Sequence, residues 1–357
     1  TLPASASLGD QIIFTDYARN WGTNGIELDS NGLNYQGDDD SFDVEYSTDG
    51  QSVHIVYVDA TKGWIPISDD DVADVPTKTG LNGLFGYGWN AAVNMSNKVS
   101  TAGVVATDTT GVGTARSWIA ACQYGVGKAI FGYGYAGGNH NVTNLVSNTG
   151  VISTDTTGVG VTRYALGAAS YGSDKGIFAY GSPSIAVSNL ISNTGVVAAD
   201  LTGVGTVRSQ VAACEYGGDK GIFGYGGGYM SLTNLVSNVG VVATDTTGVG
   251  TARNALAACS YGGDKGIFGY GVTGGGDVSM TNLVSNAGVV AADVTGVGTA
   301  RDEIAACEYG GDKGMFGYGH SSGNVSLTNL VSTAGVVATD TTGVGTARKG
   351  PGGCSYN

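Results

Sequence analysis

The sequence has little of what marks several common protein classes. It contains only 5 Pro beside 63 Gly in 357 residues, which excludes a collagen. Lys and Arg number 16 against 30 Asp and Glu, and the net charge of −14 disfavours binding to nucleic acid or to an anionic membrane surface. No stretch approaches the roughly 18 continuous apolar residues of a membrane helix, so no membrane insertion is expected.

Helical patterns are also missing, because no apolar stripe recurs every 3.6 residues. A hydrophobic content of 41% nevertheless argues against disorder, and the length is sufficient for one or two domains with a buried core. These features together predict an all-β protein.

A repeated phrase organises the chain from residue 83 onward. ATDTTGVGTAR ends at Arg116 and returns, with variation, at steps of 47, 45, 45, 48 and 47 residues. A second phrase, FGYG or its variant, begins at Phe85, Phe131, Phe178, Phe223, Phe268 and Phe316. Such a period is typical of solenoids and propellers, and it predicts six copies of one structural unit.

Each copy predicts four short strands. In one copy they are Leu256 to Gly262, Lys265 to Gly271, Thr281 to Asn286 and Gly288 to Asp293. Gly-Gly-Asp between the first two strands is typical of a tight hairpin, and Asp-Thr-Thr-Gly-Val-Gly predicts a turn in which Asp bonds its own backbone. Four strands in about 46 residues, repeated six times, predict a six-bladed β-propeller with four-stranded blades.

The two ends of the repeat separate the propeller from its alternative, an open β-solenoid. The first copy begins at Gly83 to Gly88 without a preceding strand of its own, and Ala347 to Asn357 supplies the missing strand. A C-terminal strand that completes the first blade closes a ring and covers two sheet edges, whereas a solenoid would carry polar caps. We therefore predict a propeller over residues 80–357.

The order of elements resembles that of kelch-type propellers. In that family a strand ending in a Gly pair is followed by a strand ending in an acidic turn, then by a short strand and an Arg that opens the next blade. Here Tyr-Gly follows Phe-Gly in place of the Gly pair, Asp108 and Arg116 occupy the corresponding places, and the usual Trp is missing. The resemblance covers residues 83–357 and implies an architecture without a single activity.

Residues 1–68 carry no trace of the repeat and predict a small β-sandwich-like domain. Its expected strands are Gln11 to Ala18, Gly25 to Ser30, Ser41 to Ser47, Ser52 to Asp59 and Trp64 to Ser68, with hairpin turns at residues 48–50 and 60–63. The strand from Ser52 is apolar on both faces, so we expect its second face to meet a neighbouring subunit or the propeller. Residues 69–79 predict an exposed acidic linker.

Two runs of this N-terminal module, GDQIIFTDYARNWGTNGIELDSNG and VHIVYVDATKGWIPIS, resemble a β module of tailed-phage virion proteins, notably fibres and appendages. In that module a Gly-Asp opening, an Asn-Gly turn and a Tyr-Val-Asp-Ala-Thr-x-Gly-Trp ending recur, and the ending here spans Tyr57 to Trp64. The resemblance covers about residues 8–68. It implies display on a virus particle, with residues 1–68 contacting other virion proteins or further copies of the chain.

The repeated polar residues indicate structure rather than chemistry. Each Cys lies six residues after a repeat Arg, and Ala169 takes the sixth place, so a small buried core residue is favoured over a disulfide or a metal ring. They are Cys122, Cys214, Cys259, Cys307 and Cys354. An Asp also recurs in every copy, with an Arg eight residues after it, and these residues predict a turn bond or an inter-blade ion pair, with metal or anion binding as the alternative. The six are Asp108, Asp155, Asp200, Asp245, Asp293 and Asp340.

The remaining motifs lack the neighbouring elements or residues that their usual chemistry needs. Gly132 to Gly137 fits G-x-G-x-x-G, but no helix follows to bind a phosphate. Asp38 to Asp40 with Asp43 lacks the Gly and Glu of a Ca²⁺ loop, so a solvated acidic turn is favoured. His54, His140 and His320 have no metal-ligand spacing. We therefore expect no enzyme, no metal and no cofactor.

The copies differ mostly between the FGYG phrase and the Asn of the TNLVSN phrase that follows it. This segment has 8 to 11 residues. Equivalent loops lie on one face of a propeller, so these segments are either free to drift or form a recognition surface. The candidates are Trp89, Tyr135, His140, Tyr229 and His320.

These expectations favour a phage virion surface protein, made in the host cytoplasm, as a head or tail fibre, an appendage or a capsid decoration that recognises a host glycan or protein. The alternative is an extracellular lectin or adhesin of a cell. A carbohydrate-active enzyme is disfavoured because no carboxylate pair lies outside the repeat.

Overall fold

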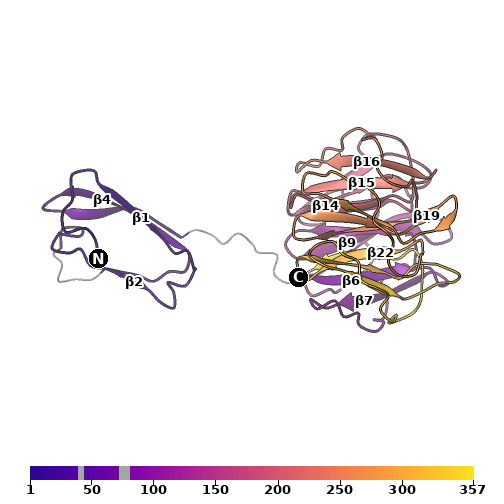
Figure 1. The fold of residues 1–357 in the computed structure, drawn as a ribbon, viewed down its shortest axis with the longest axis horizontal. Helices are drawn as coiled ribbons and strands as arrows, with labels where there is room; N and C mark the ends of the chain where they lie inside the picture. The colour runs from indigo at the N-terminus through magenta and orange to yellow at the C-terminus, as the bar shows by residue number, and fades with distance from the viewer. Residues whose placement is uncertain (39–43, 72–80) are drawn as a thin grey trace. The chain divides into compact units, whose positions relative to one another are not determined.

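The computed structural model describes residues 1–38, 44–71 and 81–357, and these residues form strands and turns. Contacts divide the chain into two compact units, Thr1–Thr77 and Lys78–Asn357 (Figure 1). The sheets contain two or three strands and are antiparallel. The described residues include no helix, and hence none with the length and apolarity of a membrane span. The predicted all-β class is confirmed.

In the N-terminal unit two small sheets share one core. The first sheet has the order β1 (Gln11–Thr15), β4 (Gln51–Asp59) and β5 (Gly63–Asp71), and the second pairs β2 (Ile26–Leu28) with β3 (Val44–Tyr46). All five strands lie where the sequence predicts them. Strand β5 runs three residues into the expected linker at 69–79, and residues 72–79 of that linker lie outside the described residues, as do Asp39, Asp40 and Asp43.

One face of strand β4 is buried in this core and the other is not. Val53 and Ile55 are fully buried, and Tyr57 meets Trp64 edge to face at 5.6 Å. On the opposite face Val56 is half-buried, and Ile13 of the neighbouring strand is 65% exposed. The N-terminal unit thus buries only one face of β4, as expected, because five short strands supply one core only. What contacts the second face stays a prediction.

The turn before β5 shows why the hairpin needs its glycine. Asp59 Oδ1 accepts hydrogen bonds from the backbone N–H groups of Thr61 and Lys62, at 2.8 and 2.7 Å. Gly63 then adopts a φ of +68°, and a Cβ there would collide with the Asn34 carbonyl. A side chain at residue 63 is excluded both by the backbone conformation and by this contact.

The second unit, which we call the repeat unit, contains six three-stranded antiparallel sheets (Figure 1). Their strands, in sheet order, are β25 (Gly352–Tyr356), β6 (Asn82–Gly88) and β7 (Val93–Val99); β8 (Ala120–Tyr124), β9 (Lys128–Tyr135) and β10 (Asn139–Val146); β11 (Gly167–Tyr171), β12 (Lys175–Ala179) and β13 (Ser188–Ile191); β14 (Ala212–Tyr216), β15 (Lys220–Gly226) and β16 (Met230–Val236); β17 (Ala257–Tyr261), β18 (Lys265–Gly269) and β21 (Thr281–Val284); and β22 (Ala305–Tyr309), β23 (Lys313–Gly317) and β24 (Thr328–Val331). A separate hairpin pairs β19 (Val272–Thr273) with β20 (Gly276–Asp277).

The predicted fourth strand of each copy is not a regular strand. In the sheet of β17, β18 and β21, residues 288–294 are attached to β21 by two isolated bridges, Thr281 to Val294 and Val284 to Val290. Between the bridges the Asn282 Nδ2 donates a hydrogen bond of 3.0 Å to the Ala291 carbonyl. A side chain thus takes the place of a backbone donor, which interrupts the ladder and corrects the expectation of four regular strands.

The C-terminal strand completes the first sheet, as the sequence predicts. Strand β25 pairs with β6, and Cys354 lies opposite Leu84. The first strands of the six sheets also contact one another in succession, and β25 contacts both β22 and β8. Residues 83–88 and 347–357 are therefore joined in one sheet although they lie at opposite ends of the repeat.

A cycle of backbone hydrogen bonds links the six sheets. Six equivalent residues each donate an N–H to the carbonyl of the equivalent residue in the adjacent sheet, at 2.6 to 3.3 Å. In order, they are Trp118, Gly350, Glu303, Ala255, Gln210 and Ala165, which donates back to Trp118. All six have φ between +47° and +57°, a region that non-glycine residues seldom occupy. We call these residues the Trp118 ring.

Side chains from adjacent sheets interlock between them. The Phe268 ring meets the Tyr225 ring at 5.2 Å, and a Cβ on Gly224 would lie 2.7 Å from Phe268. The first Gly of the FGYG phrase is therefore needed for the close approach of an aromatic ring rather than for backbone freedom. Part of the high glycine content follows from this contact, which recurs from sheet to sheet.

All five Cys are free thiols buried between sheets, as the sequence predicts for a small core residue. Burial raises the pKa of the Cys214 thiol to about 12, so the group stays neutral. Its sulfur fills the space beside Gly266 of the next sheet, where an added Cβ would lie 2.5 Å from Sγ. Gly221 faces Ala169 in the same way, with a Cβ distance of 3.1 Å.

This packing predicts a compensating pair of substitutions. Gly266→Ala should lower the free energy of unfolding by about 1–3 kcal/mol because the new methyl overlaps the Cys214 sulfur. Cys214→Ala alone should cost about 1 kcal/mol, and the double variant should recover most of the Gly266→Ala loss. Urea denaturation measures all three, with Gly221→Ala as the milder matched control. Additive losses, or a melting temperature that falls on adding a reducing agent, would contradict this packing.

Candidate functional site

The repeated Arg, which are buried, and the repeated Asp, which are partly exposed at the side chain, form a network between adjacent sheets. Arg253 donates from Nε to the Tyr270 carbonyl at 2.8 Å, from Nη1 to the Thr251 carbonyl at 3.0 Å and from Nη2 to Asn282 Oδ1 at 2.7 Å. Its guanidinium also lies 4.4 Å from the Tyr225 ring centroid in the preceding sheet. The six equivalent Arg are Arg116, Arg163, Arg208, Arg253, Arg301 and Arg348, and each is buried.

The Asp completes this network across the boundary between copies. Asp293 accepts hydrogen bonds from the N–H and hydroxyl of Thr251, at 3.0 and 2.6 Å, and from Asn282 Nδ2 at 2.9 Å. Its carboxylate lies 3.9 Å from Arg253 Nη1. Burial raises the pKa of Asp293, but the hydrogen bonds of Thr251 and Asn282 and the charge of Arg253 outweigh it, so the pKa lies below its usual value.

The recurring Arg and Asp are therefore accounted for by structure, and the predicted ion pair between copies is confirmed. The expectation that Asp bonds its own turn is wrong, since its hydrogen bonds reach Thr251 of the preceding copy. One copy departs from the pattern: Val161 replaces Thr and donates to Asp200 through its N–H alone, at 3.0 Å.

Non-repeated side chains gather at the Trp118 ring. Around the ring, large and small residues alternate: Trp118, Ala165, Gln210, Ala255, Glu303 and Gly350. Alternation fits the geometry, because six large side chains could not converge on so narrow a space. The cavity between them measures about 80 Å³, far below the roughly 300–1,000 Å³ of pockets that enclose small ligands. A ligand at this end would rest on the rim.

Three aromatic side chains form one part of that rim. Trp118 lies 6.0 Å from Tyr135 and 5.4 Å from Tyr164 between ring centroids, and the two Tyr rings lie 5.3 Å apart. Trp118 Nε1 donates a hydrogen bond of 2.7 Å to Glu303, whose other oxygen accepts from Lys349 Nζ at 3.0 Å. All five residues are partly exposed, so the cluster offers aromatic surface next to a carboxylate and an amine.

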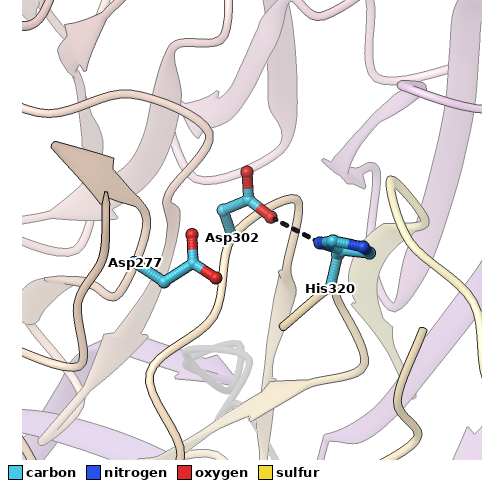
Figure 2. Close-up of side chains that lie close together, drawn as sticks. All are labelled: Asp277, Asp302 and His320. Atoms are coloured by element: carbon cyan, nitrogen blue, oxygen red, sulfur yellow. Dashed lines mark ion pairs between the residues drawn. The ribbon is translucent and has the colours of Figure 1, made fainter. Parts of the chain in front are cut away.

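A second polar group lies next to Glu303. The backbones of Asp302 and His320 exchange two hydrogen bonds, of 2.9 and 2.8 Å, and Asp302 Oδ1 lies 3.7 Å from His320 Nδ1. Burial, followed by the negative charges of Glu303 and Asp277, raises the pKa of Asp302 to about 6. Figure 2 shows the three side chains Asp277, Asp302 and His320 turned toward one another.

The structure brings together some of the predicted recognition residues and separates others. Tyr135, Trp89 and His320 pair with Ser117, Lys349 and Asp302, the residues directly before members of the Trp118 ring. Trp89 is 38% exposed.

The other two candidates, His140 and Tyr229, each lie in or next to a hairpin connection of their own sheet. His140 Nε2 lies 3.5 Å from the Ala136 carbonyl within its own hairpin connection. Tyr229, in the connection between β15 and β16, is 46% exposed.

Sequence reasoning missed Trp118, Tyr164, Gln210, Glu303 and Lys349. A signal was present: the two residues after each repeat Arg read SW, YA, SQ, NA, DE and KG, although the flanking positions are nearly constant. Variation inside the most constant part of a repeat indicates positions where packing between copies does not require one residue type.

No protein-family model matches the chain, and no curated protein matches it.

Proposed function

We propose that residues 80–357 form a six-bladed β-propeller whose Trp118 ring and rim recognise carbohydrate, and that the chain is a non-enzymatic surface protein of a tailed-phage virion. The propeller is supported by the six sheets, by the pairing of β25 with β6 and by the closed cycle of hydrogen bonds through the Trp118 ring. Each copy then contributes one blade, and the C-terminal strand completes the first blade.

The observation that carries recognition is the gathering of non-repeated aromatic and polar side chains at one place. Residues that hold the sheets together recur in every copy, whereas Trp118, Tyr135 and Tyr164 do not. A sugar presents an apolar C–H face that stacks on aromatic rings and hydroxyls that bond to carboxylate and amine groups. The aromatic cluster beside Glu303 and Lys349 offers both kinds of contact.

The virion assignment rests on the resemblance of residues 8–68 to phage fibre and appendage modules. The exposed face of β1, β4 and β5 adds a physical reason for an anchoring role, since Ile13 is 65% exposed there beside Val56 and Ile65. We propose that this face contacts further copies of the chain. Light scattering should then show an oligomer for the full chain and a monomer for residues 78–357. The same number of copies per particle for both would contradict this contact.

Glycan binding by the full chain tests the recognition surface. We expect immobilised bacterial surface glycans to retain the protein and Trp118→Ala to weaken binding at least about tenfold, or about 1.4 kcal/mol. Alanine already occupies the equivalent ring positions 165 and 255 with the same backbone conformation, so this variant should fold normally. Tyr229→Ala is the control and should bind like wild type.

Two outcomes would contradict the proposal that this surface recognises carbohydrate. One is no retention on any glycan, and the other is equal binding by Trp118→Ala and wild type. The alternative, a cellular lectin or adhesin, shares the same surface. Capsid or tail genes beside the gene for this chain would favour the virion, and their absence would favour the cell.

A further inference from the structure

We propose that Asp277, Asp302 and His320 form a binding site for a divalent transition-metal ion, with Zn²⁺ as the best fit. Each residue offers one ligand atom, and these atoms all lie within 4.8 Å of one another. Figure 2 shows the two carboxylates and the imidazole facing a common space. The inference does not depend on carbohydrate binding.

Backbone structure fixes the positions of the three residues before any ion binds. Asp302 and His320 are held opposite each other by their two backbone hydrogen bonds, and Asp302 directly follows the buried Arg301. Asp277 ends the short hairpin of β19 and β20, where it pairs with Val272. Side-chain movement alone is therefore needed to close the site, which lowers the entropic cost of binding.

The carboxylate of Asp302 lacks the partner that a buried oxygen normally has. Its Oδ1 is buried and has no hydrogen-bond partner among the described residues, and His320 Nδ1 lies beyond hydrogen-bond distance at 3.7 Å. Buried polar atoms in proteins are nearly always paired, and an exception calls for an explanation such as a missing ion. A cation between Asp277, Asp302 and His320 would satisfy this oxygen and relieve the repulsion between the carboxylates.

None of the three residues is required by the repeated fold. The positions equivalent to Asp302 hold Ser117, Tyr164, Ser209, Asn254 and Lys349, and those equivalent to His320 hold Trp89, Tyr135, Ser182, Gly227 and Val272. Asp277 lies in the longest of the variable connections. Three departures from the repeat, all with side chains that ligate metals, thus meet at one place between two adjacent sheets.

The donor set selects the ion. Ca²⁺ and Mg²⁺ take shells of oxygen ligands, whereas an imidazole nitrogen with two carboxylates suits Zn²⁺ and its neighbours. Zn²⁺ at about 2.0–2.2 Å from tetrahedral ligands would bring the ligand atoms to about 3.4 Å from one another. The pair Asp302 and His320 is already near this separation at 3.7 Å. Three protein ligands leave one position open for water or a bound molecule.

Isothermal titration of the metal-free full chain with ZnCl₂ tests the site. We expect one Zn²⁺ per chain and a rise of the melting temperature with zinc, because an ion that binds the folded state stabilises it. Asp302→Ser and His320→Ser should each weaken binding at least about a hundredfold. Ser occupies the equivalent positions 117, 209 and 182, so both variants are compatible with the repeat.

His140→Ser is the matched control and should keep wild-type zinc affinity. Wild-type zinc affinity in His320→Ser or Asp302→Ser would overturn the site. A wild-type chain that binds no zinc would overturn it as well. CaCl₂ in place of ZnCl₂ should give no heat of binding at the same concentrations. Tighter binding of Ca²⁺ than of Zn²⁺ would overturn the assigned ion class.

Discussion

Deleting residues 347–357 should lower the melting temperature of the repeat unit by about 10–20 °C, which corresponds to about 5 kcal/mol in a unit of this size. The deletion removes β25 and exposes the edge of β6 along five paired residues. It also removes Arg348 from its buried network and Gly350 from the cycle of backbone hydrogen bonds. Differential scanning calorimetry measures the change, and light scattering should show association through the exposed edge.

A matched deletion separates closure from chain length. Removing residues 1–77 takes away a whole compact unit and should leave the melting temperature of the repeat unit nearly unchanged. A variant without residues 347–357 that melts like the intact chain and keeps its oligomeric state would show that β25 does not hold the repeat unit together.

Replacing one buried arginine should have the second large effect. Arg253→Met should lower the free energy of unfolding by about 3–5 kcal/mol, because the fully buried guanidinium makes three hydrogen bonds and its removal leaves buried acceptors without a donor. Asn282 Oδ1 and the Tyr270 carbonyl would lose their donors, and Asp293 would lose the neighbouring positive charge. Urea denaturation at neutral pH measures the loss.

The sequence offers its own control for this substitution. Thr251→Val reproduces the natural Val161, whose N–H still binds the carboxylate of Asp200. It should cost about 1 kcal/mol, the net worth of one hydrogen bond. Equal and small effects of Arg253→Met and Thr251→Val would show that Arg253 does not hold adjacent sheets together.

Acid should weaken the same network. The pKa of Asp293 is lowered in the folded state, as are those of Asp108, Asp155, Asp245 and Asp340. A lowered carboxyl pKa contributes stability that is present above the unfolded value of about 3.9 and is lost as the pH falls through the folded value. The difference between wild type and Arg253→Met should therefore shrink below about pH 4.

Local chemistry explains why much of the fold was predictable. The hairpin glycines, the apolar alternation of β4 and the period of the FGYG phrase act within a few residues, and each predicts a strand or turn that the structure contains. The pairing of β25 with β6 was also predictable, because the first copy lacks one strand and the C-terminus supplies it. The irregular fourth segment was not, since it depends on the Asn282 side chain bonding to Ala291.

The partners of the repeated Asp were beyond sequence reasoning for a similar cause. A turn sequence indicates which groups can bond, but the register between adjacent sheets decides that Asp293 meets Thr251 of the preceding copy instead of its own backbone. The sequence by itself determined the all-β class, the six copies and the position of nearly every strand. These features arise from short-range backbone preferences repeated along the chain.

Tertiary structure alone decided where the non-repeated side chains meet. Trp118 and Glu303 are 185 residues apart and belong to different copies, yet they share a hydrogen bond, and Asp277 meets Asp302 and His320 across two sheets. No spacing in the sequence encodes these contacts, because each residue departs from the repeat independently. They arise only when the cycle through the Trp118 ring brings the start of every copy to one narrow end, where a few large side chains fill the space that small ones leave.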